Sequence, residues 1–185
     1  MFAVTKRRAV CRASAFTLVE TMIGLALLAI LFAAAIPSWG RHFAERTLRE
    51  RADALADSFL LARAEAIRRG GRVAVCPRAA DRCDPGAAGW EHGWLVFADD
   101  NRNGVRDAGE PVVAREGAAL VGLTIRGNRP VADYVSYTSL GQLRRIDGAL
   151  QMGSFIVCRS GLAGRKVVLA NGGRVRVAAA DGACP

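Results

Sequence analysis

An uncharged run of 20 residues, positions 21–40, is the feature that most limits how this chain can fold. A helix rises about 1.5 Å per residue, so this run is long enough to cross about 30 Å of hydrocarbon. Residues 1–15 carry four basic side chains and no acidic one. The positive-inside rule therefore predicts one transmembrane helix over residues 16–39, with residues 1–15 in the cytoplasm and the remainder across the membrane.

Two other interpretations of the apolar run remain. A cleaved secretory signal has a shorter apolar core and a small-residue cleavage site, whereas Ile36-Pro37-Ser38-Trp39 is a poor site. The second interpretation is that the run forms a buried helix in a soluble domain. Glu20 lies inside the apolar segment, where a carboxylate costs a few kcal/mol unless it is paired. Glu20 is therefore a functional candidate, and a simple marker of the membrane boundary is the alternative.

The segment Ala15-Phe16-Thr17-Leu18-Val19-Glu20, between a basic leader and an apolar helix, resembles the class III signal of type IV pilins and type II secretion pseudopilins. The resemblance implies that prepilin peptidase cuts between Ala15 and Phe16 and methylates the new amine of Phe16. Ala15 stands where the family usually has glycine. The resemblance also implies that Glu20 pairs with the N-terminal amine of a neighbouring subunit, and that Pro37 is the family's helix-kinking proline.

The helix is expected to continue beyond Pro37 as an amphipathic segment over residues 40–70. Gly70-Gly71 provides the signal that ends it. Apolar residues recur there at spacings of three and four, which predicts one buried helical face: Leu48, Ala52, Leu55, Phe59, Ala62 and Ala66.

Residues 71–185 are expected to form a β-rich extracytoplasmic head. The candidate strands are 72–76, 94–98, 111–115, 120–125, 134–137, 154–158, 165–170 and 174–178. Strands without helices between them imply antiparallel sheets. The predicted fold class is therefore α+β and pilin-like, a long N-terminal helix packed on an antiparallel head.

Five cysteines are present, and the predicted cleavage removes Cys11 with the leader. Four cysteines in an extracytoplasmic head allow three disulfide pairings. Local closure favours Cys76 with Cys83 and Cys158 with Cys184. A four-cysteine zinc site is the rival, and it lacks any C-x-x-C pair.

The head also resembles the GspH/FimT group of minor pilins. The resemblance is carried by three segments, of which the middle of the head is the most specific: residues 62–67 (Ala-Arg-Ala-Glu-Ala-Ile), 90–97 (Trp-Glu-His-Gly-Trp-Leu-Val-Phe) and 99–111 (from Asp-Asp-Asn-Arg-Asn-Gly to Gly-Glu-Pro).

One of these segments fits a calcium-loop pattern, with oxygen-bearing side chains at alternate positions around Gly104. The candidate ligands are Asp99, Asn101, Asn103, Asp107 and Glu110. Strands flank this segment where an EF-hand has helices, so a hairpin loop built from Asx turns is the alternative. No other cofactor is indicated.

Basic residues are unevenly distributed in a chain whose net charge is +9. Residues 81–116 contain 8 acids and 4 arginines, whereas residues 120–185 contain 9 bases and 3 acids. Gly173-Arg174-Val175-Arg176 resembles the GRxR motif with which FimT-type minor pilins bind DNA in natural transformation. The candidate phosphate-binding residues are Arg165, Lys166, Arg174 and Arg176. A solvated edge strand that resists aggregation is the alternative.

These resemblances imply a minor pilin of a type IV pilus machine, in the bacterial inner membrane with a periplasmic head, and extracellular once it is in a filament. Expected partners are other pilin or pseudopilin subunits, prepilin peptidase, the inner-membrane assembly platform and double-stranded DNA. The alternative is a GspH-like minor pseudopilin of type II secretion. A membrane-anchored enzyme is the third interpretation. The sequence contains no nucleophile elbow, P-loop or metalloprotease helix, so we expect no catalysis.

Overall fold

The computed structural model describes residues 17–80, 82–84 and 89–184, without the side chains of residues 33–38 and 183. The chain divides into two compact units at His42 and Phe43. Helix α1 (Leu18–Arg69) has 52 residues and contributes to both units.

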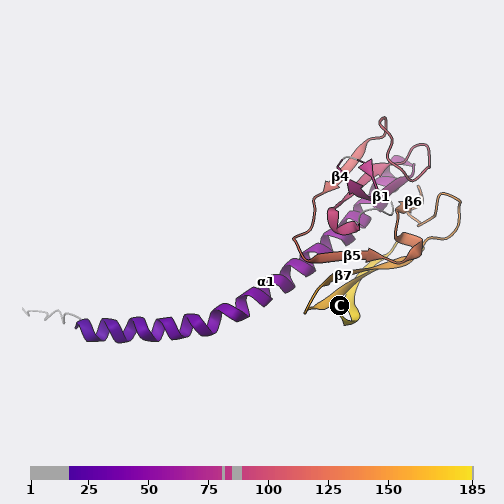
Figure 1. The fold of residues 1–185 in the computed structure, drawn as a ribbon. Helices are drawn as coiled ribbons and strands as arrows, with labels where there is room; N and C mark the ends of the chain where they lie inside the picture. The colour runs from indigo at the N-terminus through magenta and orange to yellow at the C-terminus, as the bar shows by residue number, and fades with distance from the viewer. Residues whose placement is uncertain (1–16, 81, 85–88, 185) are drawn as a thin grey trace, which may run out of the picture. The chain divides into compact units, whose positions relative to one another are not determined.

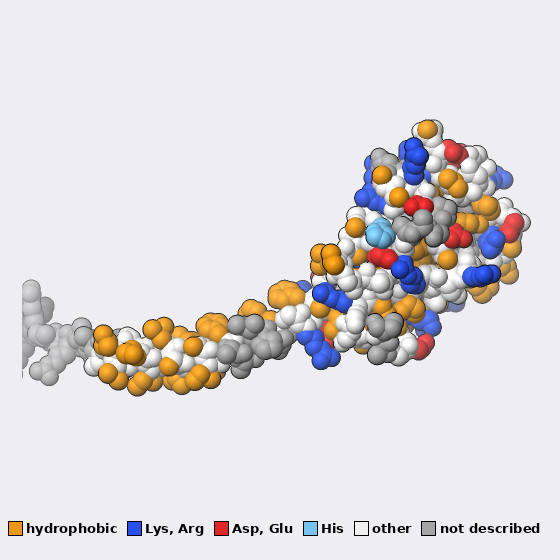
Figure 2. Space-filling model, in the orientation of Figure 1, with side chains coloured by type: hydrophobic (Ala, Val, Ile, Leu, Met, Phe, Trp, Pro, Cys, Tyr) orange, Lys and Arg blue, Asp and Glu red, His pale blue; other side chains and the backbone are white. Residues whose placement is uncertain are grey.

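In the first unit, the described apolar side chains of α1 are exposed, including Leu25, Ile30 and Phe32. Figure 2 shows them covering the visible face of this part of the helix. Within the described residues, no helix is both long enough and apolar enough to cross a membrane. The membrane crossing over residues 16–39 therefore stays a prediction.

In the second unit, α1 ends at the predicted glycine pair. Gly70 has a φ of +65°, a conformation that glycine adopts without steric cost. The amide of Gly71 donates to the carbonyl of Ala66 at 3.3 Å, and the amide of Gly70 donates to that of Ile67 at 3.3 Å. This pair of bonds is a Schellman motif, which satisfies carbonyls at the helix end.

Two antiparallel sheets follow the helix (Figure 1). The first has the order β2-β1-β3-β4, with β6 also paired to β1. Its strands are β1 (Val73–Ala79), β2 (Arg82–Cys83), β3 (Trp94–Ala98), β4 (Val112–Glu116) and β6 (Val135–Tyr137). The second sheet has the order β5-β7-β8-β9. Its strands are β5 (Leu123–Gly127), β7 (Gly153–Arg159), β8 (Ala163–Leu169) and β9 (Val175–Ala183). The α+β fold class is therefore confirmed.

The core forms where both sheets pack against the second part of α1. All six residues of the predicted helical stripe, from Leu48 to Ala66, are buried in it. Phe59 on the helix meets Trp90 at 6.1 Å and Phe155 at 5.3 Å between ring centroids. These rings join the helix to η1 (Trp90–His92) and to β7 of the second sheet. The periodicity of the sequence therefore predicted the core face of the helix correctly.

The first sheet is covered on both faces, whereas the second sheet is covered on one. Ala74, Leu95 and Phe97 form a second small apolar cluster on the side of the first sheet away from the main core. In the second sheet, the residues of β7, β8 and β9 that alternate inward join the main core, among them Phe155, Val167 and Val177. The alternate residues face outward, so the outer face of the second sheet is available for contacts.

Candidate assembly and nucleic-acid-binding sites

The predicted processing site, Ala15 and Phe16, lies outside the described residues. The first described residue, Thr17, lies immediately before α1, and its hydroxyl oxygen accepts a hydrogen bond from the backbone amide of Glu20 at 3.3 Å. This is an N-cap, and Thr17 with Glu20 three residues later matches the capping-box pattern. Glu20 is exposed in the first helical turn, where a carboxylate also interacts favourably with the helix dipole. Glu20 therefore has a local role that the motif comparison did not indicate.

The other residue with an expected assembly role is Pro37. It lies within the span of α1, and its side chain falls outside the described part of the chain. Its expected role as a helix kink stays a prediction.

Of the two arginines of the GRxR segment, Arg174 immediately precedes β9, the edge strand of the second sheet, and Arg176 is its second residue. Val175 and Val177 pack against the core, so Arg174 and Arg176, which alternate with them, lie on the outer face. Both are exposed, and neither has an ion pair with a residue that the structure describes. They line a hollow of about 510 Å³ together with Val168 and Ala170. Two unneutralised guanidinium groups beside a hollow are suited to binding an anion.

The other two predicted phosphate-binding residues are adjacent on β8 and therefore point to opposite faces. Lys166 is paired with Ala178 and lies on the outer face, on the same side as Arg176. Arg165 is paired with Ala179 and lies on the inner side, where it lines a hollow of about 150 Å³ with Leu48 and other residues of α1. The two-residue period of a strand therefore separates Arg165 from the other three candidate residues.

The candidate calcium loop uses its carboxylates to bind its own backbone. Asp99 is fully buried, and its two oxygens accept hydrogen bonds from the amides of Asn103 at 3.0 Å and Gly104 at 3.2 Å. Glu110 accepts from the amides of Asp100 at 2.9 Å and Asp107 at 3.0 Å. Burial raises the pKa of Asp99, and the two amide bonds oppose that rise.

The amide side chains of the same loop converge on one carboxylate. Asn101 and Asn103 both donate to Asp107, at 2.6 Å and 2.8 Å. Over the part of the chain that the structure describes, no group of three or more histidine, cysteine, aspartate or glutamate residues is arranged to hold a metal ion. The observed contacts are those of the Asx-turn alternative, and no finding supports the calcium prediction.

The four cysteines of the head form two disulfides, Cys76–Cys83 and Cys158–Cys184. This is the pairing that local closure favours, and it occupies all the sulfur ligands that the rival zinc site would need. The second disulfide joins β7 to the C-terminal end of the chain. It lies at the end of β9 away from Arg174 and Arg176.

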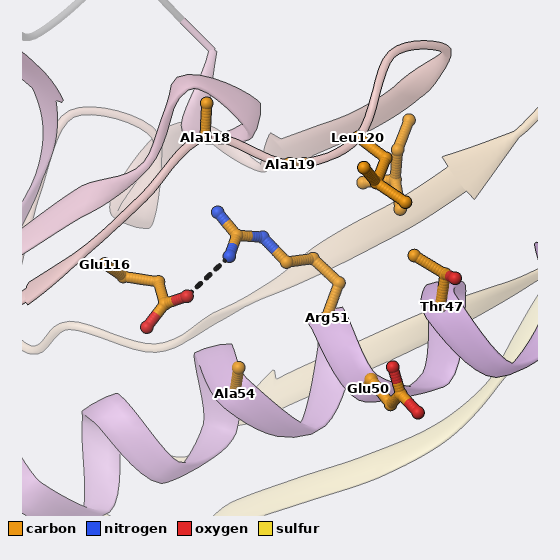
Figure 3. Close-up of a pocket in the computed structure, with 9 residues that line it drawn as sticks. Thr47, Glu50, Arg51, Ala54, Glu116, Ala118, Ala119 and Leu120 are labelled. Carbon is orange, nitrogen blue, oxygen red and sulfur yellow. Dashed lines mark hydrogen bonds and ion pairs between the residues drawn. The ribbon is translucent and has the colours of Figure 1, made fainter.

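Sequence patterns did not indicate the role of Arg51, which lies on α1 and points toward the loop after β4 (Figure 3). Its guanidinium lies 4.3 Å from the ring centre of Trp94, donates to Glu116 at 2.7 Å and bonds to the carbonyl of Gly117. Burial lowers the pKa of Arg51, and Glu116 opposes that change. A pocket of about 290 Å³ lies beside this group, between α1 and Leu120. Arg51 therefore stabilises the contact between helix and head.

Comparison with known proteins agrees with this fold. The chain matches the family model "Type II transport protein GspH" over residues 51–173 and the "Prokaryotic N-terminal methylation motif" over residues 11–36. No curated protein sequence matches the chain significantly.

Three solved structures are similar to the chain. Two are crystal forms of the type IV minor pilin FimU of Pseudomonas aeruginosa, with 20% and 18% identity and TM-scores of 0.51 and 0.50. They cover 74% and 71% of this chain and 92% of their own. The minor pseudopilin EpsH of the Vibrio cholerae type 2 secretion system has 14% identity and a TM-score of 0.49, over 71% of this chain and 96% of its own.

The FimU structures share the fold, and the GspH model covers most of the sequence. The methylation motif matches residues 11–36, before that region. The chain therefore belongs to the GspH family of minor pilins and pseudopilins.

Proposed function

We propose that this protein is a minor pilin of a type IV pilus machine, that it assembles at or near the filament tip, and that its head binds duplex DNA without sequence preference during natural transformation. Its role is structural and non-catalytic. Prepilin peptidase removes residues 1–15, and the mature chain enters the filament from the inner membrane, through the assembly platform, with its head in the periplasm. The N-terminal methylation motif supports this route.

One observation carries the DNA-binding part of the proposal. Arg174 and Arg176 are exposed on one face of an edge strand, and no described acidic side chain neutralises them. Cations of this kind bind phosphates and release condensed counterions, which favours binding without base recognition. The similarity of Gly173-Arg174-Val175-Arg176 to the GRxR motif points to the same ligand.

The test is a titration of the full chain, in non-ionic detergent, with a fluorescent DNA duplex at several salt concentrations. Replacing Arg174 and Arg176 by glutamine is expected to weaken binding and to reduce the slope of log K against log salt by about two. Arg82 and Arg102 are exposed outside the second sheet and provide the control pair. Equal losses from both pairs, or no binding by the unmodified protein at low salt, would refute DNA binding by this surface.

A second candidate is a minor pseudopilin of type II secretion, and the match to the GspH family model favours it. In that case the head helps to initiate the pseudopilus that moves folded proteins across the outer membrane. The two candidates differ in what is lost when the protein is removed. Loss of pili and of transformation supports the first, whereas loss of protein secretion with normal pili supports the second.

A further inference from the structure

The outer face of the second sheet carries a row of residues that runs across all four strands. Arg126 on β5 is paired with Ile156 on β7, Ile156 with Lys166 on β8, and Lys166 with Ala178 on β9. Residues paired in this way lie side by side on the same face of a sheet. Arg126 and Lys166 are therefore aligned on the face that also carries Arg176.

Arg176 belongs to the next row along the strands. It is paired with Val168 on β8, which lies two residues from Lys166. Strands are about 4.8 Å apart, so the distance from β5 to β9 is about 14 Å. Arg174, Arg176, Lys166 and Arg126 thus extend from one edge of the sheet to the other, a distance that a DNA backbone crosses in a few phosphates.

The side chain of Arg126 is fixed by an ion pair with Glu91, a largely buried carboxylate that also has a second hydrogen bond. Its Nη1 lies 2.7 Å from one carboxylate oxygen of Glu91 and donates to the other at 2.9 Å. The second oxygen also accepts the amide of Ile125, and the side chain of Glu91 is only 13% exposed. The side chain of Arg126 is 62% exposed, and its contacts with Glu91 use only one of its three nitrogens. Glu91 therefore orients Arg126 and leaves donors available to a ligand.

Lys166, in contrast, is paired with an acidic side chain that is almost fully exposed to water. Its ammonium lies 3.1 Å from Asp181, whose side chain is 93% exposed. An ion pair this open to water contributes little, so a phosphate oxygen can take the place of the aspartate. Asp181 also places a negative charge on the surface that a phosphate must approach.

Aromatic side chains are lacking among the described residues of the outer face. Those that alternate outward on the four strands are Thr124, Arg126, Ser154, Ile156, Cys158, Lys166, Val168, Arg176, Ala178 and Ala180. Proteins that prefer single strands stack the bases on aromatic rings. This face offers cations without rings, which suits the outside of a duplex.

We infer that the DNA-binding surface extends across the sheet to Arg126, and that Asp181 weakens binding by competing with phosphate for Lys166. This inference depends on the proposed DNA binding and adds two residues with opposite effects. Arg126 contributes a phosphate contact, and its removal weakens binding. Removal of the Asp181 charge strengthens binding.

The experiment measures binding of a 30-base-pair duplex to the full chain in non-ionic detergent. Asp181→Asn is expected to tighten binding about 1.5- to 5-fold, the range of an exposed ion pair. Arg126→Gln is expected to weaken binding and to reduce the salt slope by about one. Asp53→Asn, on an exposed position of α1, and Arg82→Gln, on β2, make the same charge changes away from this face. Circular dichroism checks that each variant is folded.

The outcomes separate the inference from the function on which it depends. If the unmodified protein binds the duplex, and binding requires Arg174 and Arg176, the proposed function stands. The extension is then wrong if Arg126→Gln matches Arg82→Gln, or if Asp181→Asn matches Asp53→Asn. A single strand of the same length that binds as tightly as the duplex would also overturn it. Failure of the unmodified protein to bind refutes the function and the inference together.

Discussion

Gly173 lies so close to the main-chain carbonyl oxygen of Gly141 that a β-carbon on Gly173 would overlap it. Gly173 is buried and has a φ of +83°, in the left-handed region that side chains rarely adopt. In the same turn, the carbonyl of Asn171 accepts a hydrogen bond from the amide of Leu143 at 2.8 Å. The turn that presents Arg174 is therefore fixed against the segment before β7.

We predict that Gly173→Ala destabilises the head by about 1–3 kcal/mol, because the substituted residue is strained and displaces the neighbouring chain. DNA affinity should fall as well, since the turn sets the position of Arg174. Urea unfolding followed by tryptophan fluorescence measures the first effect, and the duplex titration measures the second. Gly172→Ala is the control, because a β-carbon there meets nothing within 4 Å. Equal stability of the two variants would contradict the packing argument.

The sequence was sufficient to predict the elements whose signal is periodic. The helix ends at Arg69 as the glycine pair indicates, and the predicted strand at residues 94–98 coincides with β3. The short elements β2, η1 and η2 (Arg129–Val131) were not predicted, because two or three residues carry no periodicity. Their positions depend on contacts between distant segments, such as the hydrogen bond from the Trp90 indole to the carbonyl of Ala132 at 2.7 Å.

Only part of the candidate phosphate-binding site could be predicted from the sequence, because some of its residues are brought together by contacts between distant segments. The alternation of Arg174 and Arg176 is a local pattern, and the structure places both on one face as expected. The alignment of Arg126 in one row with Lys166, two strands away, depends on the register of three strands, which no local pattern fixes. Arg165 and Lys166, both candidates from the sequence, lie on different faces because adjacent residues of a strand point to opposite sides.

The two disulfides are predicted to stabilise the head to different extents. Cys158 and Cys184 are separated by 26 positions, and Cys76 and Cys83 by 7. The chain-entropy relation gives about 3.5 kcal/mol for the longer loop and about 2.4 kcal/mol for the shorter one. Serine at both positions of each pair, followed by urea unfolding, tests this order. A larger loss from the shorter loop would show that packing, and not loop closure, sets the contribution.

Glu65 is predicted to make the head less stable in acid. Hydrogen bonds from Arg68 and then Arg69 lower the pKa of Glu65 from 4.5 to about 2. The native state therefore holds this proton less tightly than the unfolded chain does, and the resulting stabilisation is present above pH 4.5 and lost as the pH falls to about 2.

The free energy of unfolding should consequently fall more steeply between these pH values in the unmodified protein than in Glu65→Gln. The comparison must be between the two proteins, because burial raises the pKa of Asp99 and gives a contribution of the opposite sign. Parallel curves for the two proteins would show that the arginine contacts of Glu65 are not maintained in solution.

Processing is predicted to remove residues 1–15 and to leave an N-methylated Phe16. Mass spectrometry of the protein extracted from membranes of a strain with active prepilin peptidase measures the mass of the N-terminal peptide. Ala15→Gly restores the residue usual in the family and should be cut at least as completely. An intact Met1 terminus, or a cut after residue 40, would contradict the pilin-like route.

The assembly role of Glu20 can be separated from its local role at the start of α1. The backbone amide of Glu20 is bonded to the hydroxyl of Thr17, and glutamine serves as well as glutamate at this position of a capping box. Glu20→Gln should therefore keep the start of the helix but lose the charge that attracts the N-terminal amine of a neighbouring subunit. Glu20→Ala also keeps this bond, because the backbone amide donates it, and it loses the charge too. If the charge matters, both variants should enter the membrane and be absent from sheared filaments, as measured by immunoblot. Normal incorporation of both variants would remove the assembly role of Glu20.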